Sequence, residues 1–161
     1  MTTPDSAAKR PAPPLGLSFF ALVGLALLGI PRVILNDLHI IEEGSPITWL
    51  LAVLPPVIWI AAALWAKVPN PFLTVFVIGA IFGVLLMLTH QLFWVSAFDG
   101  TPPDVGGPVG AIVPRIAAVF SGTFTGAIIG VVAGLVAWGL QALIGRSRRQ
   151  PVVTEDGPDR S

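Results

Sequence analysis

Charged residues are almost absent from the long middle of this chain. Residues 16–144 hold only eight of the 18 Lys, Arg, Asp and Glu side chains, although they make up most of the 161 residues. A soluble protein needs polar and charged side chains to cover its surface, and ordinary soluble domains carry about 25% charged residues. With 11% overall, concentrated in the two tails, this sequence predicts an integral membrane protein.

Four charge-free windows are long enough to cross a bilayer as helices, which takes about 20 apolar residues each. They predict an all-α fold, a four-transmembrane-helix bundle with helices near 15–35, 47–66, 71–94 and 114–144. In this interpretation residues 15–145 form the transmembrane domain. The polar tails 1–14 and 146–161 are expected to be disordered. The first window has no small-x-small cleavage site, which favours an uncleaved signal anchor.

The positive charges indicate how the chain is threaded through the membrane, because short cytoplasmic segments are enriched in Lys and Arg. One side carries six of them: Lys9, Arg10, Lys67, Arg146, Arg148 and Arg149. The other side carries Arg32 and Arg115. Both termini are therefore expected in the cytoplasm. Composition rich in Ala, Gly and Pro, with Arg exceeding Lys, is typical of bacteria, so the expected location is the cell membrane, the bacterial inner membrane.

Tryptophans and prolines refine this topology. Trp49 and Trp94 are expected in the outer aromatic belt and Trp65 near the inner one, whereas Trp59 falls near mid-membrane and needs a partner for its indole N–H inside the bundle.

Residues 66–71 include Asn70-Pro71, which disfavours helix at Asn70 and suits a helix start at Pro71. The second and third helices are therefore expected to form an antiparallel hairpin.

A stripe of small residues marks the fourth predicted helix. Gly122, Gly126, Gly130 and Gly134 recur every four residues, and the third helix carries a shorter match at Gly79 and Gly83. Small side chains at this spacing allow close backbone approach between transmembrane helices. The stripe predicts tight packing within the bundle, with homo-oligomerisation and a pore lining as alternatives.

His90 is the ionisable residue that lies deepest in a predicted span. It follows Gly83 by seven residues and Gly79 by eleven, so it shares their helix face and should point into the bundle. An intramembrane ionisable residue is a candidate functional residue. The alternatives are a neutral His bonded to a neighbouring carbonyl, a proton-handling or ligand-binding His, and a metal ligand.

Two Pro-Arg pairs place Arg32 and Arg115 at the outer boundary, close to His90 in this threading. We expect a polar cluster with His90 at its floor, and at least one Arg–carboxylate pair, of Arg32 with Asp37 or of Arg115 with Asp99 or Asp104. The cluster either ties the helices together or binds an anion, since Arg binds carboxylate and phosphate bidentately. No metal site is expected; the weak candidates are His39, Glu42 and Glu43.

Several function classes lack the residues that they need. There is no Cys, no catalytic motif and no dense basic patch, so no cofactor and no nucleic-acid partner is expected, and an enzyme is the less favoured class. The first hypothesis is a small non-enzymatic membrane protein, an accessory protein that binds a membrane partner or lipid. The alternatives are a homo-oligomeric transporter or channel that uses His90, and a membrane-surface enzyme acting on an anionic substrate.

Overall fold

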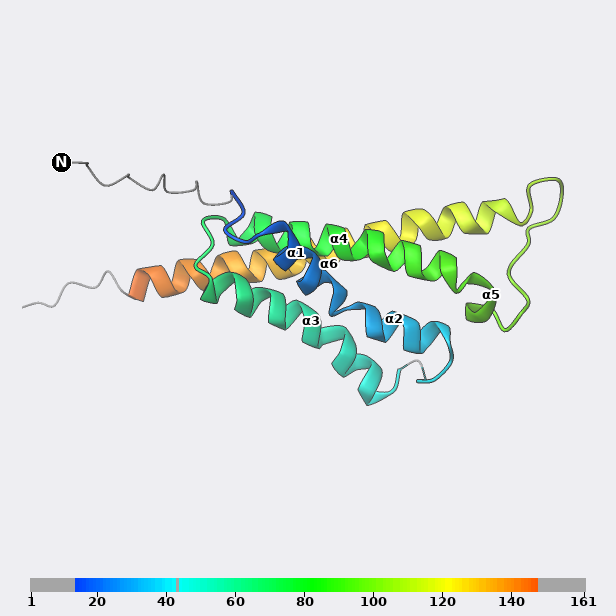
Figure 1. The fold of residues 1–161 in the computed structure, drawn as a ribbon, viewed down its shortest axis with the longest axis horizontal. Helices are drawn as coiled ribbons and strands as arrows, with labels where there is room; N and C mark the ends of the chain where they lie inside the picture. The colour runs from blue at the N-terminus through cyan, green and yellow to red at the C-terminus, as the bar shows by residue number, and fades with distance from the viewer. Residues whose placement is uncertain (1–13, 43, 148–161) are drawn as a thin grey trace, which may run out of the picture.

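The computed structural model describes residues 14–42 and 44–147, and within these residues the chain is entirely helical, with no strand (Figure 1). Four helical segments are long and apolar enough to cross a membrane. Most of both tails and Glu43 lie outside the described residues. The helices are α1 (Phe19–Leu27), α2 (Ile30–Asp37), α3 (Pro46–Trp65), α4 (Pro71–Leu92), α5 (Trp94–Ala97) and α6 (Ile112–Ser147).

The first span is broken into two helices, whereas the sequence predicted one helix near 15–35. Ser18 caps the start of α1 by accepting a hydrogen bond from the Ala21 N–H, and the chain leaves the helix after Leu27 and resumes it at Ile30. Pro31 has no N–H to continue the α1 hydrogen-bond ladder. Gly29 lies against the ring of Phe82, where a Cβ would clash. The break therefore coincides with a missing donor and a close contact.

The bundle has two distinct ends (Figure 1). The start of α1, the α3–α4 turn and the end of α6 lie at one end, which we call the Lys67 end. The α2–α3 loop and residues 98–111 lie at the other, the His90 end. The predicted antiparallel α3–α4 hairpin is confirmed. Lys67 takes a positive φ of 50° in the turn, and Asn70 caps α4 by accepting from the Leu73 N–H at 3.0 Å.

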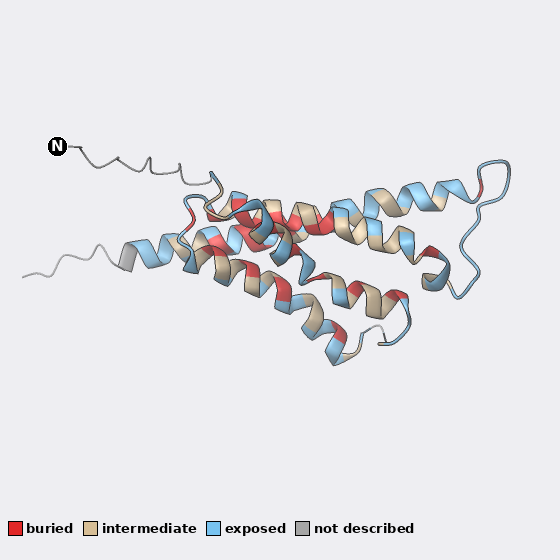
Figure 2. Cartoon of the chain, viewed as in Figure 1, coloured by how far each residue is buried: buried red, intermediate tan, exposed pale blue. Residues whose placement is uncertain are grey.

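Helices α4 and α6 run side by side and pack at their glycines (Figures 1 and 2). A Cβ built on Gly83 would lie 2.8 Å from the Thr123 carbonyl oxygen, and one on Gly134 would lie 2.8 Å from the Phe72 carbonyl oxygen. Gly79 faces Gly130 and Gly83 faces Gly126, backbone against backbone, while Gly122 faces Met87. The stripe is thus occupied by another helix of the same chain.

Trp59 anchors the remaining helices at the centre of the bundle. Its side chain is 1% exposed, its ring centroid lies 5.7 Å from that of Phe82, and its indole N–H donates to the Leu25 carbonyl oxygen at 2.7 Å. The predicted internal partner of this indole is therefore confirmed. The acceptor belongs to the last turn of α1, where the Leu25 carbonyl oxygen also accepts a short-range hydrogen bond from the Leu28 N–H at 3.2 Å.

Candidate ligand-binding site

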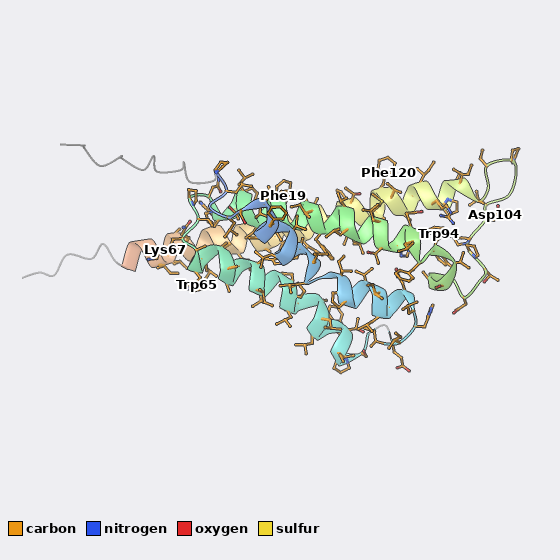
Figure 3. The ribbon with its side chains drawn as sticks, viewed as in Figure 1. Phe19, Trp65, Lys67, Trp94, Asp104 and Phe120 are labelled. Carbon is orange, nitrogen blue, oxygen red and sulfur yellow. The ribbon has the colours of Figure 1, made fainter. Side chains whose placement is uncertain are left out.

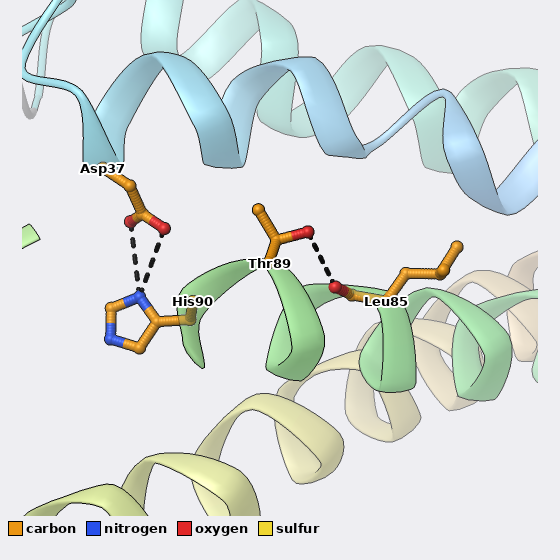
Figure 4. Close-up of polar contacts among 4 residues, drawn as sticks. All are labelled: Asp37, Leu85, Thr89 and His90. Atoms are coloured by element: carbon orange, nitrogen blue, oxygen red, sulfur yellow. Dashed lines mark hydrogen bonds and ion pairs between the residues drawn. The ribbon is translucent and has the colours of Figure 1, made fainter. Parts of the chain in front are cut away.

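The central contact of the candidate site joins the end of α2 to the last turn of α4. Nδ1 of His90 lies 3.3 Å from each carboxylate oxygen of Asp37 (Figure 4). The Asp37 side chain is 10% exposed and that of His90 is 31% exposed. A buried carboxylate is costly without a partner, so the imidazole satisfies Asp37 at the point where the two helices meet.

An aromatic cluster surrounds the imidazole. The rings of Trp94 and Phe98 lie edge-on to that of His90, with centroids 5.7 and 6.2 Å away, and to each other at 4.9 Å. Trp94 is only 3% exposed. Trp94 lies at the His90 end, and its side chain packs inside the protein; its place in an outer aromatic belt stays a prediction. The helix α4 ends at Leu92, and α5 begins with Trp94, which is labelled in Figure 3. The Trp94 ring packs edge-on against the ring of His90.

Arg115 reaches this cluster without pairing with a carboxylate. Its guanidinium carbon lies 5.1 Å from the centroid of the Trp94 ring, and its Nη1 donates to Oε1 of Gln91 at 3.4 Å. The Gln91 amide donates in turn to the Arg115 carbonyl oxygen at 3.1 Å. These contacts fix the start of α6 to the end of α4 through a cation–π interaction and a side-chain hydrogen bond.

The predicted pairs of Arg115 with Asp99 or Asp104 are wrong, and both carboxylates have other partners. Asp99 lies 3.7 Å from Nδ1 of His39, and both side chains are largely exposed, so the pair contributes little stability. Asp104 accepts a hydrogen bond from the Gly106 N–H at 2.7 Å inside its own loop. Figure 3 shows Asp104 on this loop beyond the helices.

The predicted pair of Arg32 with Asp37 is also wrong. Five residues of helix turn the side chain by about 140°, so the two residues face different elements of the bundle. Asp37 faces α4, whereas Arg32 lines spaces beside α3. Nε of Arg32 is buried and has no hydrogen-bond partner among the described residues. A buried donor left unpaired costs about 1–3 kcal/mol, and more when it is charged.

A cavity of about 510 Å³ opens beside the Asp37–His90 pair at the His90 end. Its polar lining comes from Asn36, Asp37, His39, Glu42 and His90, and its apolar lining from Ile41, Ala97 and Phe98. The carboxylates of Asp37 and Glu42 give this cavity two acidic groups, and no Lys or Arg of residues 14–42 and 44–147 lines it. It is large enough for a side-chain-sized ligand.

Of the weak metal candidates, His39 and Glu42 line the same cavity, and Glu43 lies outside the described residues. No group of three His, Asp or Glu side chains that could hold a metal ion occurs within residues 14–42 and 44–147. His39 also pairs with Asp99.

The structure thus brings together His90 and Asp37. Arg115 lies on the Trp94 ring, which in turn contacts His90. The other predicted cluster residues, Arg32, Asp99 and Asp104, do not contact this pair. Sequence reasoning missed Phe98 and Asn36 as lining residues. His90, Trp94 and Phe98 recur every four residues, and that spacing was a signal for one aromatic cluster. Asn36 follows Arg32 by four residues and therefore shares its helix face.

Comparison with known proteins gives no relative: no family model, no curated protein and no solved structure matches this chain. The class that the fold itself supports is a multi-pass membrane protein with four candidate spans.

Proposed function

We propose that this chain is a small, non-enzymatic accessory protein of the bacterial inner membrane. Both termini lie in the cytoplasm, and the His90 end faces outward. The charge distribution supports this orientation, since six Lys and Arg residues fall on the Lys67 side of the threading and two on the other. The bilayer covers the exposed apolar faces of the four spans.

The observation that carries the function is the acidic cavity at Asp37 and His90. Each Asp37 oxygen receives one long contact from a single imidazole nitrogen, so both retain free lone pairs for a further donor. Glu42 adds a second carboxylate to the lining. The cavity therefore suits a positively charged group, and we propose that it binds a Lys or Arg side chain of a membrane partner.

Photo-crosslinking in cells tests this function. A photoreactive amino acid replaces Ile41, which lines the cavity, or Leu92, which is 79% exposed on the lipid-facing side of α4. We expect a discrete crosslinked product from position 41. Asp37→Asn should abolish it by removing the charge, while Asp99→Asn at the exposed loop should leave it intact. A product that persists with Asp37→Asn, or appears equally from position 92, contradicts the proposal.

A homo-oligomeric transporter is the second candidate, because His90 also lines a separate space of about 190 Å³ with Ser121 and Thr125 of α6. The contact of Gly83 with Gly126 lies deeper along α4 and α6, where backbone meets backbone and leaves no room for a path. Transport through this interface would therefore require a second copy. In the crosslinking experiment, this function predicts a product of twice the chain's own mass.

A further inference from the structure

Arg32 occupies an unusual position for a charged side chain in a membrane span. It lies five residues before the end of α2, about 7.5 Å along the helix. Its guanidinium forms no ion pair within the described residues, and its Nε atom is buried without a hydrogen-bond partner. Arginine keeps its positive charge in proteins. The structure thus leaves the buried Nε–H of a cationic side chain without an acceptor among the described residues.

The space around Arg32 is polar on the side toward the His90 end. There a pocket of about 190 Å³ is lined by Arg32, Asn36, Gly44, Thr48 and Trp49. Asn36 stands one turn after Arg32, and its side-chain carbonyl oxygen Oδ1, which can only accept a hydrogen bond, is also buried without a partner among the described residues. The Thr48 hydroxyl donates to the Glu42 carbonyl oxygen and is already used. Nε of Arg32, a donor, and Oδ1 of Asn36, an acceptor, are therefore the buried side-chain atoms of this pocket that have no hydrogen-bond partner among the described residues.

The space on the other side of Arg32 is apolar and runs into the bilayer region. A narrow space of about 50 Å³ leads from Arg32 past Pro55 to Ala52, Pro56 and Ile129. The same three residues line a groove of about 400 Å³ between α3 and α6, whose other walls are aliphatic and include Val57, Val132 and Val136. The three spaces share lining residues from one to the next. They form one continuous surface with a cationic end and an apolar end.

We propose that this surface binds one phospholipid, with its phosphate on Arg32 and an acyl chain in the groove between α3 and α6. Phosphate is the acceptor that a guanidinium fork fits bidentately. Lipid phosphates lie at the two edges of the hydrocarbon core, which is about 30 Å thick. Arg32 lies near the end of the first span, so it is close to the depth of the phosphates of the adjacent leaflet. The site lies on the α3 side of α2 and shares only Asn36 with the described lining of the Asp37–His90 cavity. It therefore adds a second ligand to the proposed function, and its test is independent of the cationic partner.

Native mass spectrometry of the full chain in a mild detergent tests this proposal. Phosphatidylglycerol is added, and the retained lipid is counted. We expect one tightly retained phosphatidylglycerol on the wild type, with diacylglycerol, which lacks phosphate, at least about tenfold weaker, as the loss of a charge-assisted contact implies. Glycerol phosphate, which lacks chains, should also bind far more weakly than the lipid. If the wild-type protein retains phosphatidylglycerol and diacylglycerol equally, the phosphate contributes nothing to binding and the proposal is overturned.

Two variants separate the cationic end from the apolar end. Arg32→Gln should lower retention about tenfold or more, whereas Arg115→Gln should not, because Arg115 already contacts Gln91 and Trp94. Ala52→Phe should block the junction between the narrow space and the groove, while Ala61→Phe on the exposed face of α3 serves as its control. Unchanged retention with both Arg32→Gln and Ala52→Phe contradicts the site. Helical content and monodispersity of each variant exclude loss of folding as the cause.

Discussion

The imidazole of His90 meets the Asp37 carboxylate symmetrically, with Nδ1 at 3.3 Å from both oxygens. This contact joins the first and third spans at the His90 end and forms one wall of the acidic cavity. Because a carboxylate accepts hydrogen bonds and a ring nitrogen donates only when protonated, the contact specifies where the imidazole proton lies.

The first prediction is that Nδ1 of His90 carries a proton. A neutral His90 should be the Nδ1–H tautomer, held by Asp37, with Nε2 unprotonated. ¹⁵N NMR of histidine-labelled protein in bilayers measures the protonation of each ring nitrogen directly, and His39→Gln assigns the two signals. An unprotonated Nδ1 at His90 would mean that Asp37 is the donor and would refute this arrangement.

The second prediction concerns the close contact of α4 with α6. Gly126→Ala should destabilise the protein by about 1–3 kcal/mol, because the added methyl group meets the backbone at Gly79 and Gly83. The matched control is Gly139→Ala on the same helix, where no atom lies within 4 Å of an added Cβ. Denaturation in detergent measures both. Equal effects at the two positions would show that the glycine contact has no special role.

The third prediction tests the hydrogen bond of the central tryptophan. Trp59→Phe removes the donor to the Leu25 carbonyl oxygen and should cost about 1–3 kcal/mol, since a buried acceptor loses its side-chain partner. Trp138→Phe, at a side chain that is 59% exposed, should change stability by far less. Thermal unfolding compares the two, and a smaller loss at Trp59 than at Trp138 would contradict the assignment.

The fourth prediction is the orientation of the bundle. The chain has no native Cys, so single cysteines give clean labelling. An impermeant thiol reagent added to intact cells should label Ile40→Cys and Asp104→Cys at the His90 end and should not label Lys67→Cys. All three positions are exposed in the structure. The reverse pattern would place the His90 end in the cytoplasm.

The sequence predicts the spans well, because helices in a bilayer must be long, apolar and internally hydrogen-bonded. The bounds of α3, α4 and α6 lie within three residues of the predicted ones. The break between Leu27 and Ile30 was not predicted, although Pro31 is a local signal for it. The contact of Gly29 with the ring of Phe82 lies outside what the sequence predicts, because the two residues are distant in the chain.

The candidate site was predicted only in part, and the arginines explain why. Threading placed Arg32, Asp37, His90 and Arg115 near one membrane surface, but depth alone does not specify the direction of a side chain. Asp37 was expected to face Arg32 and instead faces His90. Arg115 was expected to find a carboxylate and lies over Trp94, which required knowing that the chain turns after Leu92.

The central claim is that the Asp37–His90 cavity binds a positively charged side chain. The most direct test is an NMR titration with N-acetyl-arginine amide and N-acetyl-lysine amide, with the neutral N-acetyl-glutamine amide as the control, observed at the His90 ring nitrogens and the Asp37 carboxyl carbon. The account predicts saturable shifts at both residues with the two cationic probes, absent with the neutral one and lost with Asp37→Asn. Equal shifts with all three probes, or no saturable shift with either cation, would contradict it.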